Sequence, residues 1–258
     1  AETALGTGRM TSTFECSKKW GDYQTFLVVS LLGLVAMVGS LLLIPNNLPK
    51  GAASTIREQL SVLTNKPLLL VYAKTALGYG GAFTAFTFLA PILQQVSGFS
   101  AGAVSLILLV YGVSVAVGNI WGGKLADKMG PLPALKLLFA GLALVLLALT
   151  FTAPHPVLAV LTVLVWGAFA FGNVPGLQVL VVKQAELHTP KAVDVASGLN
   201  IAAFNVGIAL GSVVGGFVVE HLGLMHTPWI GALIVLLAYG LTHVSERREA
   251  LRLAPCQA

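Results

Sequence analysis

The chain has 258 residues, of which 56% are hydrophobic and only 10% are charged, and its formal net charge is +5. Soluble domains carry about 25% charged residues, so this composition excludes an ordinary water-soluble globular protein. The basic residues are scattered in short segments between apolar runs, which excludes a nucleic-acid-binding face.

Apolar segments recur along the chain, and each approaches the roughly 20 residues that cross a hydrocarbon core of about 30 Å. The first covers residues 24–45, and a polar linker follows over residues 46–66. The others form one bundle over residues 67–244, with spans at residues 67–93, 101–122, 132–151, 156–182, 196–219 and 228–244. The expected fold class is therefore all-α: a polytopic membrane helix bundle of about seven transmembrane helices.

The two ends of the chain differ from the spans in composition. Residues 1–23 form a polar leader in which Arg9, Lys18 and Lys19 precede the first span, on the side where basic residues are not expected. We interpret this leader as a truncation scar or a frame-shift junction, with further helices upstream in a full-length parent. Residues 245–258 form a charged tail.

The distribution of positive charge predicts the orientation of the chain, because short loops rich in Lys and Arg stay in the cytoplasm. Every second connecting segment is basic, whereas residues 94–100, 152–156 and 220–227 contain no Lys or Arg. We therefore expect a cytoplasmic C-terminus. The residues that decide this are Lys50, Arg57, Lys66, Lys124, Lys128, Lys136, Lys183, Lys191, Arg247, Arg248 and Arg252.

A charged segment follows the third span. Gly123, Asp127, Lys128 and Gly130 stand at the spacing of a Gly, three residues, an Asp, a basic residue, any residue and a Gly. A carboxylate at a helix end, close to a neighbouring helix N-terminus and to basic side chains, can hold two helices together and release them as a gate moves. We name these four residues the gating loop. The alternative is an ordinary solvated charged turn.

Two features concern helix packing. Gly207, Gly211 and Gly215 recur at four-residue spacing and form a stripe on which another helix can approach closely. Pro175 in the fifth span removes a backbone hydrogen bond and is expected to interrupt the helix. An interruption of this kind is typical of transporter sites and equally of a simple structural kink.

Polar side chains inside the spans are candidates for a substrate path. Lys74 either extends to the membrane interface or packs between helices, or it lines a cavity and binds an anionic or hydroxylated substrate. The neutral groups either bind substrate or form hydrogen bonds between helices. They are Tyr79, Thr84, Thr87, Tyr111, Asn119, Asn173, Gln178, Asn200 and Asn205.

The sequence pattern gives no support for metal or enzyme chemistry. Cys16 and Cys256 lie near opposite ends of the chain, and no His forms an i, i+4 pair with another ligand. We expect no metal site, no cofactor and no enzymatic activity.

The gating loop resembles the cytoplasmic loop signature of the major facilitator superfamily, although Pro131 and Leu132 stand where the signature has two basic residues. Residues 81–91 and 199–207 are similar to helices of bacterial drug/proton efflux permeases and of sugar efflux permeases of the arabinose type. The resemblance implies two six-helix bundles around a central cavity.

In these terms residues 24–45 are the last helix of the first bundle, and residues 46–66 are the cytoplasmic loop between the bundles. Residues 67–244 are the C-terminal six-helix bundle, and residues 245–258 are a cytoplasmic tail.

The resemblance also implies an activity, namely proton-coupled efflux of a drug, a sugar or a similar small molecule across the bacterial inner membrane by alternating access. No Asp or Glu lies inside a predicted span, so coupling to protons is expected from upstream helices. The expected partners are the lipid bilayer, the small-molecule substrate, protons, and either a missing N-terminal half or a second copy of the chain.

Other membrane classes remain as alternatives. A seven-helix receptor or rhodopsin-like protein fits the number of spans, but the last span has no Lys for a retinal Schiff base. The linker at residues 46–66 also fits a loop between bundles better. A structural or assembly subunit would need no polar groups in its spans, and this chain has several.

Overall fold

The computed structural model describes residues 26–43 and 55–253, and the chain divides into two compact units, Ala1–Lys50 and Gly51–Ala258. In the first unit the described residues form one helix, Phe26–Leu43. This helix is apolar on all sides apart from two serines, and Oγ of Ser40 donates to the carbonyl of Ala36 at 2.8 Å. A helix without a polar face suits an apolar environment better than water.

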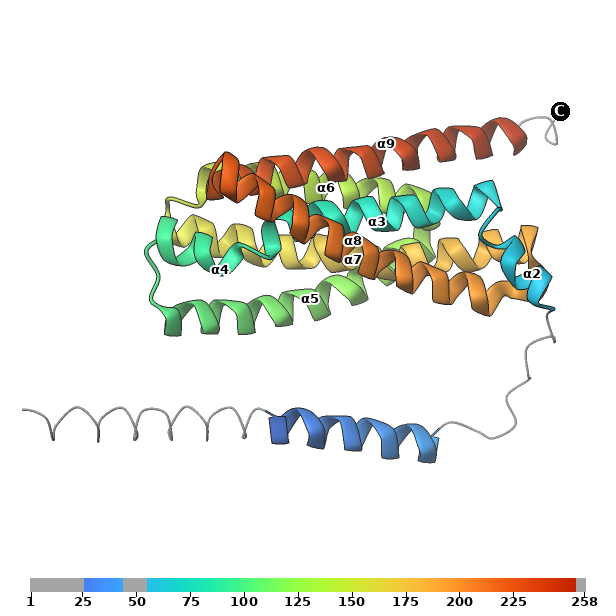
Figure 1. The fold of residues 1–258 in the computed structure, drawn as a ribbon, viewed down its shortest axis with the longest axis horizontal. Coiled ribbons are helices and arrows are strands. Elements are labelled where there is room, and N and C mark those ends of the chain that lie inside the picture. The colour runs from blue at the N-terminus through green and yellow to red at the C-terminus, as the bar shows by residue number, and fades with distance from the viewer. Residues whose placement is uncertain (1–25, 44–54, 254–258) are drawn as a thin grey trace, which may run out of the picture. The chain divides into compact units, whose positions relative to one another are not determined.

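The second unit is helical throughout most of its described residues, as Figure 1 shows. Among the described residues of the whole chain, seven helices are long and apolar enough to cross a membrane, which confirms the all-α polytopic bundle. The elements of the second unit are α2 (Ile56–Ser61), α3 (Lys66–Phe86), α4 (Leu89–Pro91), η1 (Ile92–Val96), α5 (Ala101–Met129), α6 (Pro131–Thr152), α7 (Pro156–His188), η2 (Pro190–Ala192), α8 (Val193–His221), η3 (Leu224–His226) and α9 (Thr227–Leu253).

Side-chain caps explain where the first helices of this unit begin. Thr55 and Glu58 form a capping box at α2, in which the backbone N–H of Thr55 donates to Oε2 of Glu58 at 2.8 Å. Oδ1 of Asn65 accepts from the backbone N–H of Leu68 at the start of α3. Oγ of Ser100 caps α5 in the same way.

Proline and glycine explain the breaks between helices. Pro91 has no N–H to bond the carbonyl of Thr87, and here α3 gives way to α4 and to the π-helical turn η1. Gly130 ends α5 with a φ of 87°, a left-handed value that favours glycine, and α6 begins at the next residue, Pro131.

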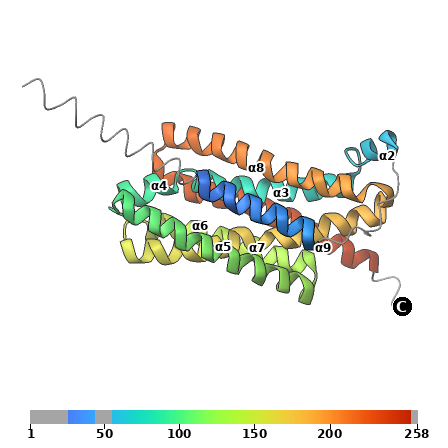
Figure 2. The same ribbon diagram turned by 90° about the horizontal axis from the view of Figure 1, so that it is seen from below.

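The six long helices of the second unit pack as neighbours that are often distant in sequence. α3 packs against α8 and α9, α7 packs against α5 and α6, and α6 also contacts α9 (Figures 1 and 2). α7 also contacts α3 and α8, so the six helices form one bundle.

Glycines set the closest helix contacts. A Cβ built on Gly211 would overlap the carbonyl of Gly80, so α8 lies with its backbone against α3. A Cβ on Gly122 would overlap the carbonyl of Gly172, which gives α5 and α7 the same close approach. Gly207 and Gly215 also face the α3 backbone, so all three glycines of the predicted stripe lie at one interface.

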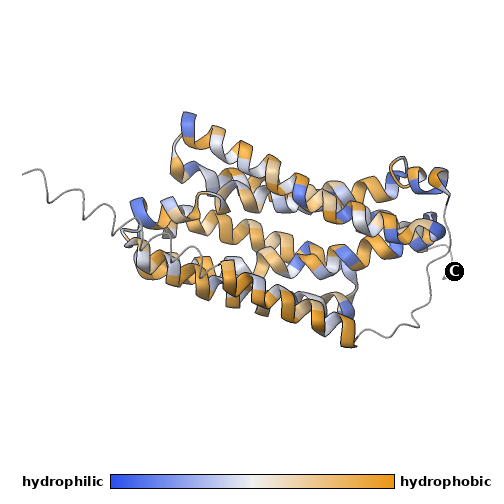
Figure 3. Ribbon diagram, turned by 60° about the horizontal axis from the view of Figure 1, so that its bottom comes forward, coloured by the Kyte–Doolittle hydropathy of each residue, from blue (hydrophilic) through white to orange (hydrophobic). Residues whose placement is uncertain are grey.

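Many large apolar side chains along the helices are exposed. In the hydropathy colouring of Figure 3, hydrophilic residues are more frequent towards the helix ends. The helix order brings the lysines to one end of the bundle, which we name the basic end. It carries Lys66, Lys124, Lys128, Lys136, Lys183 and Lys191. The opposite end carries Glu220 and the histidines His155, His221 and His226.

The helices are longer than the apolar segments that predicted them. α5 continues to Met129 and therefore includes Gly123, Asp127 and Lys128, while α7 continues to His188. A span predicted from hydropathy ends at its first charged residue, but a charged residue does not end a helix.

The predicted interruption of the fifth span at Pro175 is wrong, because α7 is a single helix that contains Pro175.

Candidate functional site

Three helices bring a set of polar side chains together inside the bundle. The hydroxyl of Thr75 on α3 donates to Oδ1 of Asn200 on α8 at 2.7 Å. Nδ2 of Asn200 donates to Oε1 of Gln178 on α7 at 3.1 Å, and Nε2 of Gln178 donates to Oγ of Ser197 on α8. We name these four residues the polar cluster. Thr75 and Asn200 are fully buried.

The close α3–α8 contact allows this cluster to form. A threonine side chain is short, and it reaches Asn200 because the glycine stripe of α8 lies directly on the α3 backbone. The hydroxyl of Tyr72 also donates across this interface, to the carbonyl of Ala196 at 3.3 Å. Lys74, beside Thr75 in the chain, is only 2% exposed, so its side chain lies within the bundle and does not extend to the surface.

Aromatic rings form a second set, which we name the aromatic cluster. The ring of Tyr79 lies 4.5 Å from that of Phe204 and 5.9 Å from those of Phe83 and Phe171, measured between ring centroids. Further contacts extend the set from Phe83 through Phe86 to Tyr111 and Trp166. The rings come from α3, α5, α7 and α8, and Phe83, Phe86, Phe171 and Phe204 are only partly buried.

Two buried polar groups on α7 have no hydrogen-bond partner among the described residues. They are the side-chain amide of Asn173, at both its oxygen and its nitrogen, and Nε1 of Trp166. Both side chains are fully buried. They are seven positions apart in the sequence, so they lie on the same face of the helix. Unsatisfied buried amides are rare in folded proteins, which marks this face of α7 as unusual.

The other predicted polar residues bond mainly within their own helices. Thr84 donates to the carbonyl of Gly80, and Asn205, which is exposed, donates to the carbonyl of Ile201. Asn119 likewise bonds to Val115. Thr87 also contacts Ser212 of α8, with 2.8 Å between the two hydroxyl oxygens.

The basic end contains the gating loop and several ion pairs. Asp127 and Lys128 are exposed in the last turn of α5, and among the described residues Asp127 has no ion-pair partner. Lys136 of α6 pairs with Glu246 of α9 at 2.5 Å. Lys191 pairs with Glu58 of α2 at 2.9 Å.

Hydrogen bonds hold Glu58 in its charged form. The backbone N–H of Thr55 is the main cause, followed by the hydrogen bond from Lys191, and together they lower the pKa of Glu58 to about 2. Hence Glu58 stays charged, and able to pair with Lys191 in the turn between α7 and α8, at any ordinary pH.

Some of the site was missed by the sequence interpretation. The aromatic cluster was not predicted, although Tyr79, Phe83 and Phe86 follow the i, i+4, i+7 spacing that puts residues on one helix face. Ser197 was also missed. In the part of the chain that the structure describes, no three His, Cys, Asp or Glu side chains are grouped so as to hold a metal ion.

Comparison with known proteins agrees with this architecture. Residues 17–189 match the family model described as the Major Facilitator Superfamily. The chain is 49% identical, over 95% of its length, to an uncharacterized MFS-type transporter of Bacillus subtilis, YtbD. It is 35% identical, over 89% of its length, to the inner membrane transport protein YdhP of Escherichia coli.

A probable sugar efflux transporter of Helicobacter acinonychis is also similar, with 32% identity over 81% of this chain. The chain spans 62% of the length of the B. subtilis relative, 58% of the E. coli relative and 52% of the Helicobacter relative.

Proposed function

Since the chain belongs to the major facilitator superfamily, we propose that it forms part of an efflux transporter that exports a small molecule from bacteria by alternating access. Family membership does not favour the receptor or rhodopsin alternative. The observation that carries the proposal is the aromatic cluster next to the polar cluster, on α3, α5, α7 and α8.

This pairing of side chains suits a substrate with both apolar and hydrogen-bonding groups. Small-molecule sites are mostly apolar and aromatic, with a few polar groups that fix the orientation of the ligand. The partly buried rings of Phe83, Phe171 and Phe204 would pack against the flat face of a sugar or a drug. Gln178 and Lys74 would then bind its hydroxyl or anionic groups.

We further propose that a second bundle completes the path. Large apolar side chains are exposed on α5 and α8, where they would face either an N-terminal half or a second copy of the chain. They include Leu106, Leu109, Val113, Leu210, Val213 and Phe217. The partial coverage of the relatives supports a parent protein with more helices.

The same partner would complete the gate and the proton coupling. Asp127 and Lys128 are exposed at the basic end, so they are free to contact a second bundle on the proposed cytoplasmic side. Proton uptake would depend on an acidic group outside these six helices, whose Asp and Glu residues lie near the helix ends.

An efflux assay in membrane vesicles with an imposed pH gradient tests this function. We expect no gradient-dependent export of dyes or sugars by the chain alone, and measurable export when a matching N-terminal bundle is co-expressed. Empty membranes and membranes with only the N-terminal bundle are the controls. Export by the chain alone would instead show that a homodimer, or these helices themselves, form the pathway.

A labelling experiment tests the orientation. Single cysteines at Gln94 and Lys128, both exposed and at opposite ends of the bundle, should react with a membrane-impermeant reagent from opposite sides. We expect Gln94→Cys to react in intact cells and Lys128→Cys only after permeabilisation. Reaction of both from outside would reject the cytoplasmic assignment of the basic end.

A further inference from the structure

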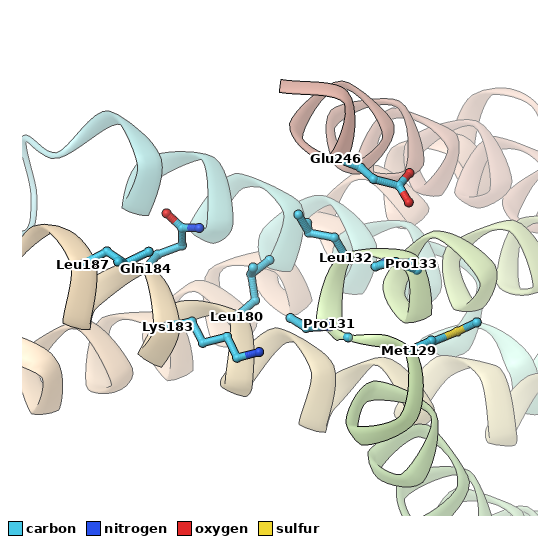
Figure 4. Close-up of a pocket in the computed structure, with 10 residues that line it drawn as sticks. Met129, Pro131, Leu132, Pro133, Leu180, Lys183, Gln184, Leu187 and Glu246 are labelled. Carbon is cyan, nitrogen blue, oxygen red and sulfur yellow. The ribbon is translucent and has the colours of Figure 1, made fainter. Parts of the chain in front are cut away.

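A pocket of about 540 Å³ lies at the basic end, apart from the polar and aromatic clusters. The turn between α5 and α6, the last turns of α7 and a residue of α9 form its walls (Figure 4). From α7 it is lined by Leu180, Lys183, Gln184 and Leu187, which share one helix face because they follow i, i+3, i+4, i+7 spacing. Apart from Gly130, no residue of the gating loop, the polar cluster or the aromatic cluster lines this pocket.

The charged groups at the pocket favour an anion. Lys183 lines one wall, and Glu246 lines the wall that α9 provides. The carboxylate of Glu246 is already paired with Lys136 at 2.5 Å, so the ammonium of Lys183 supplies the net charge.

The apolar lining favours a ligand with hydrocarbon chains. Most of the pocket wall is hydrocarbon from residues such as Pro131, Leu132 and Leu180. At the rim, Leu187 is 75% exposed and Met129 is 46% exposed. A soluble anion would gain nothing from these side chains, whereas a lipid would bury its glycerol and first methylene groups against them.

We infer that this pocket binds the headgroup of an anionic phospholipid, with the phosphate at Lys183 and the acyl chains over Leu187 and Met129. Basic pockets between transmembrane helices at the cytoplasmic side are suited to anionic headgroups, and each Lys near an anionic membrane surface contributes about 1 kcal/mol. Only the headgroup and glycerol enter, and the chains stay in the bilayer.

Native mass spectrometry measures this binding as the fraction of protein that carries lipid adducts. The full chain is released from detergent in the presence of added lipid. We expect more adducts with phosphatidylglycerol than with phosphatidylcholine. Lys183→Gln should reduce the phosphatidylglycerol adducts about fivefold, the factor that corresponds to about 1 kcal/mol per basic residue. Lys183→Arg should retain them. Lys124→Gln is the matched control, since Lys124 is exposed at the same end but does not line the pocket.

Two further experiments test whether the ligand is a lipid or a free phosphate compound, and they control for misfolding of the variants. Leu187→Ser should weaken lipid binding while leaving the helix content unchanged by circular dichroism. Soluble glycerol phosphate, in excess, should not displace the lipid. The inference would be overturned if the two lipids bound equally, or if Lys183→Gln and Lys124→Gln lost the same amount of lipid binding. It would also be overturned if Leu187→Ser lost no lipid binding, or if glycerol phosphate displaced the lipid.

Discussion

Asn173 and Asn200 are both fully buried inside the bundle, but only Asn200 is hydrogen-bonded. Asn200 accepts from Thr75 and donates to Gln178, whereas neither amide atom of Asn173 has a partner among the described residues. The same side chain, at the same degree of burial, therefore stabilises the bundle at one position and costs free energy at the other.

Leucine substitutions separate these two roles. Asn200→Leu leaves Thr75 and Gln178 with unsatisfied groups, and we expect it to lower the free energy of unfolding by about 1–3 kcal/mol. Asn173→Leu removes two unsatisfied atoms, so its effect should be neutral or stabilising. The unfolding midpoint of the purified chain in detergent is the measurement. Equal destabilisation by both changes would show that Asn173 is bonded in the folded protein.

The same pair makes a prediction for transport once a second bundle is supplied. A residue that costs stability in this state has a reason to be kept if it bonds to substrate or water in another state. We expect Asn173→Leu to reduce efflux although the protein remains stable. Thr150→Val is the control, because Thr150 lies on α6, outside both clusters, and bonds only within its own helix. Normal efflux by Asn173→Leu would remove Asn173 from the proposed path.

The glycine stripe predicts opposite effects for two neighbouring alanine substitutions. Gly211→Ala would press a methyl group against the carbonyl of Gly80 and should cost about 1–3 kcal/mol. Gly216→Ala has no atom within 4 Å of the new Cβ, and it should stabilise α8 by up to about 1 kcal/mol because alanine is the better helix former. Thermal unfolding of both variants checks this, and a loss of stability in Gly216→Ala would contradict the packing described for α8.

The aromatic cluster predicts a change in substrate affinity. Tyr79 contacts three other rings, and in the proposed path Tyr79→Leu would remove one ring from the contact with substrate, a contact worth about 0.5–1.5 kcal/mol. We expect the half-saturating substrate concentration for efflux to rise by about threefold to tenfold in the complete transporter. Phe151→Leu, at a ring that is 76% exposed and outside the cluster, should leave it unchanged. Equal effects of the two changes would argue against substrate contact.

The ion pair between Glu58 and Lys191 predicts a pH dependence for the attachment of α2. The pKa of Glu58 is lowered from 4.5 to about 2, so its charged form stabilises the attachment above pH 4.5, and this stabilisation is lost as the pH falls through about 2. A spin label at Ser61, with Cys16 and Cys256 replaced by Ser, should become mobile only in that acidic range. Glu58→Gln should make it mobile already at neutral pH. A label that moves freely at neutral pH in the unaltered protein would contradict the attachment.

The sequence predicted the number and approximate places of the spans, because the hydropathy of a segment depends only on which residues that segment contains. It also identified Gly207, Gly211 and Gly215, since close packing in membranes depends on small side chains at fixed spacing. It did not predict which polar groups meet. Whether Gln178 faces Asn200, or Asn205 faces outward, depends on the rotation of each helix about its axis, and tertiary contacts decide that rotation.

The single residue between α5 and α6 constrains how the bundle can move. Gly130 is the whole connection, so the end of α5 cannot slide along α6 or draw away from it. α6 is tied in turn to α9 through Lys136 and Glu246. A movement of Asp127 can therefore turn the end of α5 about Gly130, but it cannot separate that end from the start of α6.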